Sequence, residues 1–143
     1  MASVAGKETY PISSPATGAR KEVLVVDDDR ILRELVGDWL EAAGYEVRKV
    51  EDCQAARKAV CERVPALIVS DMFMPGTCGA AAIGELKRYA PSTALIAVSG
   101  NFKSGSGMTG DEAIAAGAAR ALAKPVKRTE LLSAVAELIG APR

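Results

Sequence analysis

Three consecutive carboxylates, Asp27, Asp28 and Asp29, follow directly after the aliphatic run Val23–Val26. The run contains three β-branched residues and predicts a buried strand, so the carboxylates would lie at its C-terminal end. Two carboxylates about 5 Å apart repel each other by roughly 3 kcal/mol at an effective dielectric of about 20. A fold that keeps them together usually does so around a metal ion or a shared proton. Ligands that are all oxygen favour Mg²⁺ over zinc.

Other strand ends carry polar or reactive side chains as well. Three further aliphatic runs are each followed by one: Ala66–Ser70 by Asp71, Ala94–Val98 by Ser99, and Ala119–Ala123 by Lys124. In a parallel sheet the C-termini of all strands lie at one edge. Asp27, Asp28 and Asp71 would therefore converge there if their two strands are neighbours.

Helical patterns between these runs complete an alternating chain. A partly polar strand is expected at the sheet edge over Tyr45–Val50. Helices are expected over 31–40, Cys53–Arg63, Ala80–Tyr89, Asp111–Ala116 and from near Thr129 to Gly140. Five strands alternating with five helices predict a doubly wound α/β sandwich.

Several helix details are specific enough to test. The apolar residues of the first helix recur at helical spacing and predict one buried face: Ile31, Leu32, Leu35, Val36, Trp39 and Leu40. On that face Trp39 is expected to pack in the core. Asp52 and Thr129 are candidate N-caps for the second and last helices.

Length and composition limit the class of protein. With 143 residues and 49% hydrophobic composition, the chain can bury one core. We expect a flexible tail over residues 1–21, where Ser, Thr, Pro, Gly and Ala mix without an apolar period, and one domain over 22–143. The 18 basic and 18 acidic residues cancel, which argues against a general attraction to nucleic acid or anionic membrane.

The types of reactive residue exclude several chemistries. The chain has no histidine, which rules out Ser-His-Asp and Cys-His catalysis and His-ligated metals. Cys53, Cys61 and Cys78 form no C-x-x-C pair, and their number is odd. We therefore expect these cysteines to be small apolar side chains of a protein in a reducing cytosol, and not a disulfide framework or a zinc site. The longest apolar stretches have only about half a dozen residues, too few for a membrane span, so a cytoplasmic location is expected.

Five short motifs occur in order along the chain. Four lie at expected strand ends, and the fifth, Met74-Pro75, follows shortly after Asp71. The strand-end motifs are Val25-Val26-Asp27-Asp28, Val69-Ser70-Asp71, Val98-Ser99-Gly100 and Lys124-Pro125. With them the chain resembles a response-regulator receiver domain of two-component signalling, from about Glu22 to Gly140. The resemblance implies a five-stranded parallel sheet in the flavodoxin-like order 2-1-3-4-5, with helices on both faces. It also implies a signalling protein that catalyses only its own phosphorylation and dephosphorylation.

The same resemblance implies a role for each site residue. Asp71 would be the nucleophile that accepts a phosphoryl group from a phosphohistidine. Asp28, Asp71 and the backbone carbonyl of Phe73 would bind Mg²⁺, with Mn²⁺ as an alternative, and Asp27 would hold the ion through water. Lys124 would contact a phosphoryl oxygen.

Further residues would support this site. The Ser99 hydroxyl would donate to the phosphoryl group, and a cis Lys124–Pro125 peptide would aim the lysine. Asp29 is expected to cap the following helix. Gly79 and Gly100 are expected to be structural.

One position departs from the family pattern. An aromatic residue or histidine often lies three residues before the lysine, where its rotamer reports phosphorylation, but here the residue is Ala121. We therefore expect phosphorylation to be read through ordering of the loop Phe102–Gly110 and a shift of Ser99.

Only Ala141, Pro142 and Arg143 follow the last expected helix, so the sequence predicts a stand-alone receiver. Its partners would be a sensor histidine kinase or a histidine phosphotransfer protein upstream and a protein target downstream. One alternative is a degenerate receiver that binds a partner without phosphorylation. A haloacid-dehalogenase-type phosphatase fits less well, because the acidic pair that family needs after its lysine is missing. A flavin-binding module is disfavoured because the three aspartates would repel its phosphate.

Overall fold

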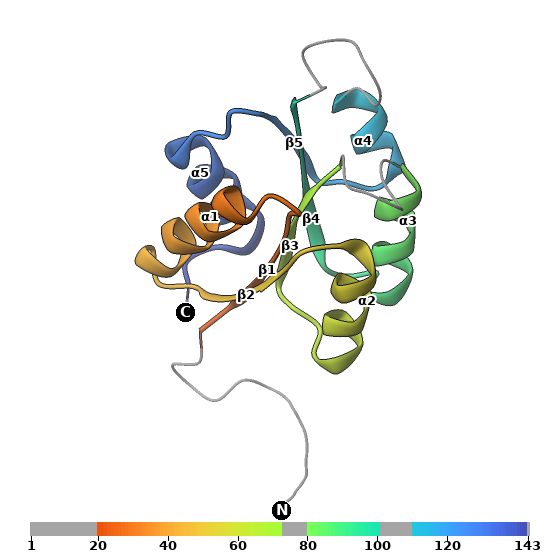
Figure 1. Cartoon of the computed structure of the whole chain (residues 1–143), viewed down its shortest axis with the longest axis horizontal. Coiled ribbons are helices and arrows are strands. Elements are labelled where there is room, and N and C mark those ends of the chain that lie inside the picture. Colours follow the sequence, from red (N-terminus) through yellow and green to blue (C-terminus); the bar gives the residue numbers. More distant parts are fainter. Residues whose placement is uncertain (1–19, 73–79, 101–109, 143) are drawn as a thin grey trace, which may run out of the picture.

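A computed structural model of the chain describes residues 20–72, 80–100 and 110–142. Within these residues, five strands and five helices alternate (Figure 1). The elements are β1 (Glu22–Val26), α1 (Arg30–Ala42), β2 (Glu46–Val50), α2 (Cys53–Glu62), β3 (Leu67–Asp71), α3 (Ala80–Tyr89), β4 (Ala94–Ser99), α4 (Gly110–Ala116), β5 (Arg120–Ala123) and α5 (Arg128–Ile139). The expected alternation is confirmed, with boundaries shifted by one or two residues.

The strands form one parallel sheet in the order β2-β1-β3-β4-β5. Val26, at the end of β1, pairs with Val50 on one side and Ser70 on the other. The predicted fold class and strand order are confirmed, and so is the edge position of β2. Because β1 and β3 are neighbours in register, the residues that follow them emerge side by side.

Helices cover both faces of the sheet (Figure 1). On one face α1 and α5 enclose a core that contains Val25, Leu40 and Leu131, and Trp39 packs against this core as predicted. On the other face α2, α3 and α4 enclose a second core around residues such as Leu24 and Ile83. The central strands β1, β3 and β4 are buried on both sides, which explains their continuous aliphatic sequences.

The predicted N-caps have different outcomes. Asp29 and Asp52 cap α1 and α2 through their carboxylates, as expected. The prediction for Thr129 is wrong, because α5 begins at Arg128 and its N-cap is Lys127, which makes no side-chain capping bond. A cap contributes only about 1 kcal/mol. Burial of an α5 residue such as Leu131 contributes more to the stability of the helix than one cap would.

The buried face predicted for the first helix is also too wide. Val36 and Leu40 are buried, but Ile31 is 79% exposed and Leu35 is 40% exposed. At about 100° per residue the six predicted residues span about half of the helix circumference. The sheet covers a narrower strip of α1 centred on Val36 and Leu40. The side chains of Ile31 and Leu35 therefore lie at the solvent-exposed edge of that strip.

No helix in the described residues is both long and apolar enough to cross a membrane. Of the three cysteines, Cys53 is buried and Cys61 is exposed, both as free thiols. Cys78 and Gly79 lie outside the described residues.

Candidate functional site

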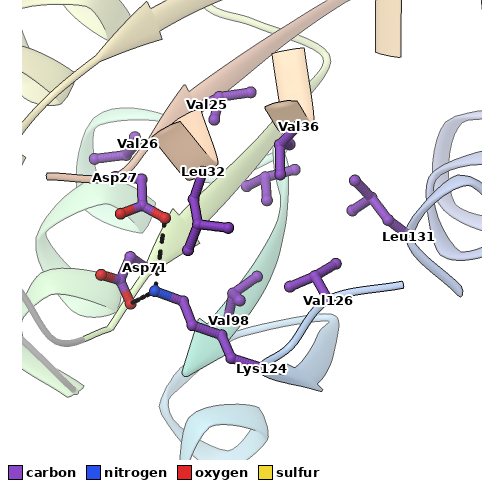
Figure 2. A pocket seen from close by; sticks show the side chains of 11 residues that line it. Val25, Val26, Asp27, Leu32, Val36, Asp71, Val98, Lys124, Val126 and Leu131 are labelled. Atoms are coloured by element: carbon purple, nitrogen blue, oxygen red, sulfur yellow. Dashed lines mark ion pairs between the residues drawn. The ribbon is translucent and has the colours of Figure 1, made fainter. Parts of the chain in front are cut away.

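The C-terminal edge of the sheet gathers the predicted site residues from four strands. Asp27 follows β1, Asp71 is the last residue of β3, and Ser99 is the last residue of β4. Lys124 follows β5 directly. Figure 2 shows the carboxylates of Asp27 and Asp71 pointing toward the ammonium group of Lys124.

Three carboxylates form a tight acidic group at this edge. One oxygen from each of Asp27, Asp28 and Asp71 lies within 4.8 Å of the others. Asp27 and Asp71 are buried, whereas Asp28 is exposed. This donor set contains only oxygen atoms and opens to solvent on the side of Asp28, so it fits a hard divalent cation such as Mg²⁺. Phe73, the fourth expected ligand, lies outside the described residues.

Lys124 supplies the positive charge of the site. Its Nζ lies 3.3 Å from Asp71 Oδ1 and 3.7 Å from Asp27 Oδ2. The backbone N–H of Lys124 donates to the carbonyl oxygen of Ser99, which ties the end of β5 to the end of β4. The Lys124–Pro125 peptide is cis, as expected. The ammonium group is therefore held between the two buried carboxylates.

Burial affects the pKa of Asp27. Desolvation raises the pKa of its carboxyl group above the ordinary value of 3.8. The N–H of Asp29, which donates to Asp27 Oδ1 at 2.9 Å, and the charge of Lys124 both oppose this rise. The net rise means that the folded site holds its negative charge at a cost, which a bound cation would reduce.

The floor of the site is apolar. A small cavity of about 20 Å³ adjoins the charged groups and is lined by side chains from the sheet, from α1, from α5 and from the segment that leads into α5 (Figure 2). Its aliphatic lining includes Val36, Val69, Val98 and Val126. A space of this size and polarity holds at most about one water molecule. The apolar side chains around this space keep the local dielectric low, which strengthens the electrostatic interactions of Asp27 and Asp71.

The turn between β1 and α1 consists of Asp27, Asp28 and Asp29 and holds two of the three carboxylates of the acidic group, those of Asp27 and Asp28. Asp29 Oδ1 accepts hydrogen bonds from the N–H groups of Ile31 and Leu32, so the third aspartate of the triplet serves the helix, as expected. Arg33 donates from Nη1 to the carbonyl oxygen of Asp27 at 2.8 Å. Arg33 could not be predicted as a site residue from the sequence, because its contact depends on how the chain turns and no spacing motif indicates it.

The other sequence expectations concern β4 and β5. Ser99 is buried at the end of β4. Ala121 is half-buried in β5, and a Cβ built on Gly110 would lie 3.4 Å from its Cβ. The beginning of α4 thus lies close to Ala121. Residues 102–109 of the expected signalling loop Phe102–Gly110 lie outside the described residues.

Gly100 follows Ser99 and lies close to Lys124. Among the described residues, a Cβ built at this position would lie 4.0 Å from the Cβ of Lys124. The structural role expected for this glycine stays a prediction.

Comparison with known proteins agrees with the geometry. The sequence matches the response regulator receiver domain family over residues 23–136. It is 33% identical to the response regulator protein FleR of Pseudomonas aeruginosa over 115 residues, which cover 80% of this chain and 24% of FleR. The chain spans between 24% and 30% of the length of three curated relatives, FleR included.

Solved structures give the same result. The receiver domain of NtrX from Brucella abortus matches with a TM-score of 0.74 and 30% identity, covering 82% of this chain and 97% of that one. A response regulator receiver domain protein from Clostridium thermocellum matches with a TM-score of 0.75 and 26% identity, covering 83% of this chain and 94% of that one. Sequence, fold and the acidic edge of the sheet agree, and the chain belongs to the response regulator receiver domain family of two-component signalling.

Proposed function

We propose that this chain accepts a phosphoryl group on Asp71. A carboxylate oxygen of Asp71 forms the new O–P bond while the N–P bond of a partner's phosphohistidine breaks, and the departing imidazole nitrogen takes up a proton. The observation that carries the proposal is the position of this carboxylate, 3.3 Å from Lys124 and inside the three-aspartate group.

Mg²⁺ is the proposed cofactor, with Mn²⁺ as an alternative. Asp28 and Asp71 would bind it directly together with the backbone carbonyl of Phe73, and Asp27 would hold it through water. A bound divalent cation offsets the repulsion between an anionic carboxylate and an anionic phosphoryl group. The mutual proximity of the three carboxylates and the raised pKa of Asp27 support this assignment.

Two further residues would contact the phosphoryl group. Lys124 exchanges part of its contact with Asp71 for a phosphoryl oxygen, so its positive charge stays in the site throughout the transfer. The Ser99 hydroxyl donates a hydrogen bond to another phosphoryl oxygen from the end of β4.

The partners follow from this chemistry. A sensor histidine kinase or a histidine phosphotransfer protein supplies the phosphoryl group, and a protein target responds to the modified domain. Among the relatives, one is a DNA-binding transcriptional regulator from Azospirillum brasilense, NtrC.

The signal is proposed to leave the site through the loop 102–110 and Ser99. Ala121 has no ring that could change rotamer, and Gly110 lies close to its Cβ. Amide chemical shifts recorded with and without beryllofluoride in the presence of Mg²⁺ test this route. Shifts in the loop and at Ser99 are expected, and an unchanged loop contradicts it.

Labelling with acetyl phosphate tests the phosphorylation itself. Incubation with acetyl phosphate and Mg²⁺ should add one phosphoryl group, about 80 Da by intact-mass spectrometry. No label should form when EDTA replaces Mg²⁺. Asp71→Asn should abolish it. Asp38→Asn is the matched control, because Asp38 is an exposed aspartate of α1. Label that persists in Asp71→Asn would refute the proposed nucleophile. A wild-type protein that is never labelled, but still binds a partner, would favour the degenerate receiver.

A further inference from the structure

Arg33 makes a contact with the acidic turn that the phosphorylation chemistry does not require. Although Arg33 lies in the first turns of α1, its guanidinium reaches back six residues, where Nη1 donates to the carbonyl oxygen of Asp27 at 2.8 Å. Its backbone N–H donates to the carbonyl oxygen of Asp29 at 2.9 Å. One residue therefore contacts the turn on both sides of Asp28.

The carbonyl group of Asp27 needs such a donor because it lies just beyond the sheet. The paired registers of β1 end at Val26, opposite Val50 and Ser70. The N–H of Asp27 still donates to the carbonyl oxygen of Val50 at 3.2 Å. A partly buried carbonyl without a partner is unfavourable, and a charged donor such as guanidinium forms one of the stronger hydrogen bonds.

Besides the bond from the Asp27 N–H to Val50 and the ion pair of Asp27 with Lys124, the turn has short-range anchors. Asp27 Oδ1 accepts from the N–H of Asp29, and Asp29 Oδ1 accepts from the first N–H groups of α1. Asp28 lies between these two anchored residues, and its direction depends on them. The Arg33 side chain is the contact that ties Asp27 to a position one turn further along α1.

We propose that Arg33 is a positioning residue of the cation site. Its guanidinium fixes the turn of residues 27–29 so that the carboxylates of Asp27 and Asp28 face Asp71, and this increases the affinity of the site for a divalent cation. The inference rests on the proposed function of the site as a Mg²⁺-dependent phosphoryl acceptor.

The sign of the effect separates positioning from simple electrostatics. Arg33 is a cation, so its charge alone repels Mg²⁺, and removing that charge would strengthen Mg²⁺ binding. Loss of a positioning contact has the opposite effect, because the carboxylates then spend less time in the arrangement that binds the ion. Partners that orient metal ligands typically change metal affinity about 10- to 100-fold. For Arg33, which contacts backbone, the expected loss is at the lower end, about tenfold.

The experiment measures Mg²⁺ affinity by isothermal titration calorimetry on the full chain. Arg33→Met keeps the aliphatic stem and removes the donor, and it should weaken Mg²⁺ binding about tenfold. Arg33→Lys keeps a charged donor and should recover part of the affinity. Arg30→Met is the matched control, since Arg30 is an exposed arginine at the start of the same helix. Its affinity should be unchanged or slightly higher.

A second measurement needs no metal. In metal-free protein, hydrogen exchange at the Asp29 amide, which bonds to Asp27 Oδ1, should be faster in Arg33→Met than in Arg30→Met. The amide of Leu24 in the buried strand reports global unfolding in the same spectra. A merely structural role would accelerate both amides and leave the Mg²⁺ affinity of the folded protein unchanged.

The outcomes distinguish the two proposals. If wild type binds Mg²⁺ and is labelled on Asp71, but Arg33→Met binds Mg²⁺ as tightly or more tightly, the role of Arg33 is refuted and the proposed function stands. If wild type neither binds Mg²⁺ nor is labelled, the proposed function fails, and the inferred effect on cation affinity fails with it. Weaker Mg²⁺ binding in Arg33→Met, with normal binding in Arg30→Met, supports the inference.

Discussion

Replacing Lys124 with Met should destabilise the metal-free domain by about 3 kcal/mol. The ammonium group lies 3.3 Å and 3.7 Å from the carboxylates of Asp71 and Asp27. At an effective dielectric of about 20 these contacts correspond to roughly 5 and 4.5 kcal/mol of attraction before desolvation is subtracted. Removing one partner from such a buried charge group costs about 3–5 kcal/mol. The lower value applies because the side chain of Lys124 is 23% exposed.

The loss of stability in Lys124→Met should depend on Mg²⁺. Without the lysine, a divalent cation no longer competes with an ammonium group for the same carboxylates, so the variant should bind Mg²⁺ at least about tenfold more tightly. In saturating Mg²⁺ each factor of ten in affinity adds about 1.4 kcal/mol to the stability of the variant relative to wild type. The difference between the two proteins should narrow by about that amount.

Urea unfolding followed by fluorescence measures both effects, because Trp39 is the single tryptophan and packs against the core. Each protein is unfolded in EDTA and in excess Mg²⁺. Lys127→Met is the control, since Lys127 is an exposed lysine three residues away. If Lys124→Met loses the same stability with and without Mg²⁺, or no more than Lys127→Met loses, the assignment of Lys124 as the counterion of the site is wrong.

Three further predictions concern the turn and the glycines. Asp29→Ala should cost about 1 kcal/mol in urea unfolding, because it removes the N-cap of α1, and an unchanged midpoint would contradict the capping geometry. Because burial raises the pKa of Asp27, the folded state holds its proton more tightly than the unfolded state. The free energy of unfolding of metal-free wild type, measured relative to Asp27→Asn, should therefore fall as pH rises from about 3.8 through the raised pKa and then level off. A relative free energy of unfolding that rises over this pH range would refute the shift. Gly44→Ala should lower the melting temperature, because Gly44 has φ +107° and a Cβ there would lie 3.1 Å from Pro142, whereas Gly84→Ala, in open space on α3, should raise it.

The limits of the sequence prediction are visible at two helices. Apolar periodicity located α1 and α5, but it could not tell which side of each apolar strip faces the sheet or where the first turn begins. Ile31 is 79% exposed, and α5 begins before Thr129. The reason is that side-chain periodicity reports an angular pattern along one helix. The width of the buried strip depends on the surfaces packed against that helix.

The sequence by itself determined the fold class, the strand order through family resemblance, and the residues that end each strand. Parallel strands bring their C-terminal ends to one edge, so the sequence alone assigns Asp27, Asp71, Ser99 and Lys124 to one site. The tertiary structure decided the distances, the burial that raises the pKa of Asp27, and the contact of Arg33 with the turn. These properties arise between residues that are far apart in the sequence or lie on either side of a turn. No local spacing of residue types encodes them.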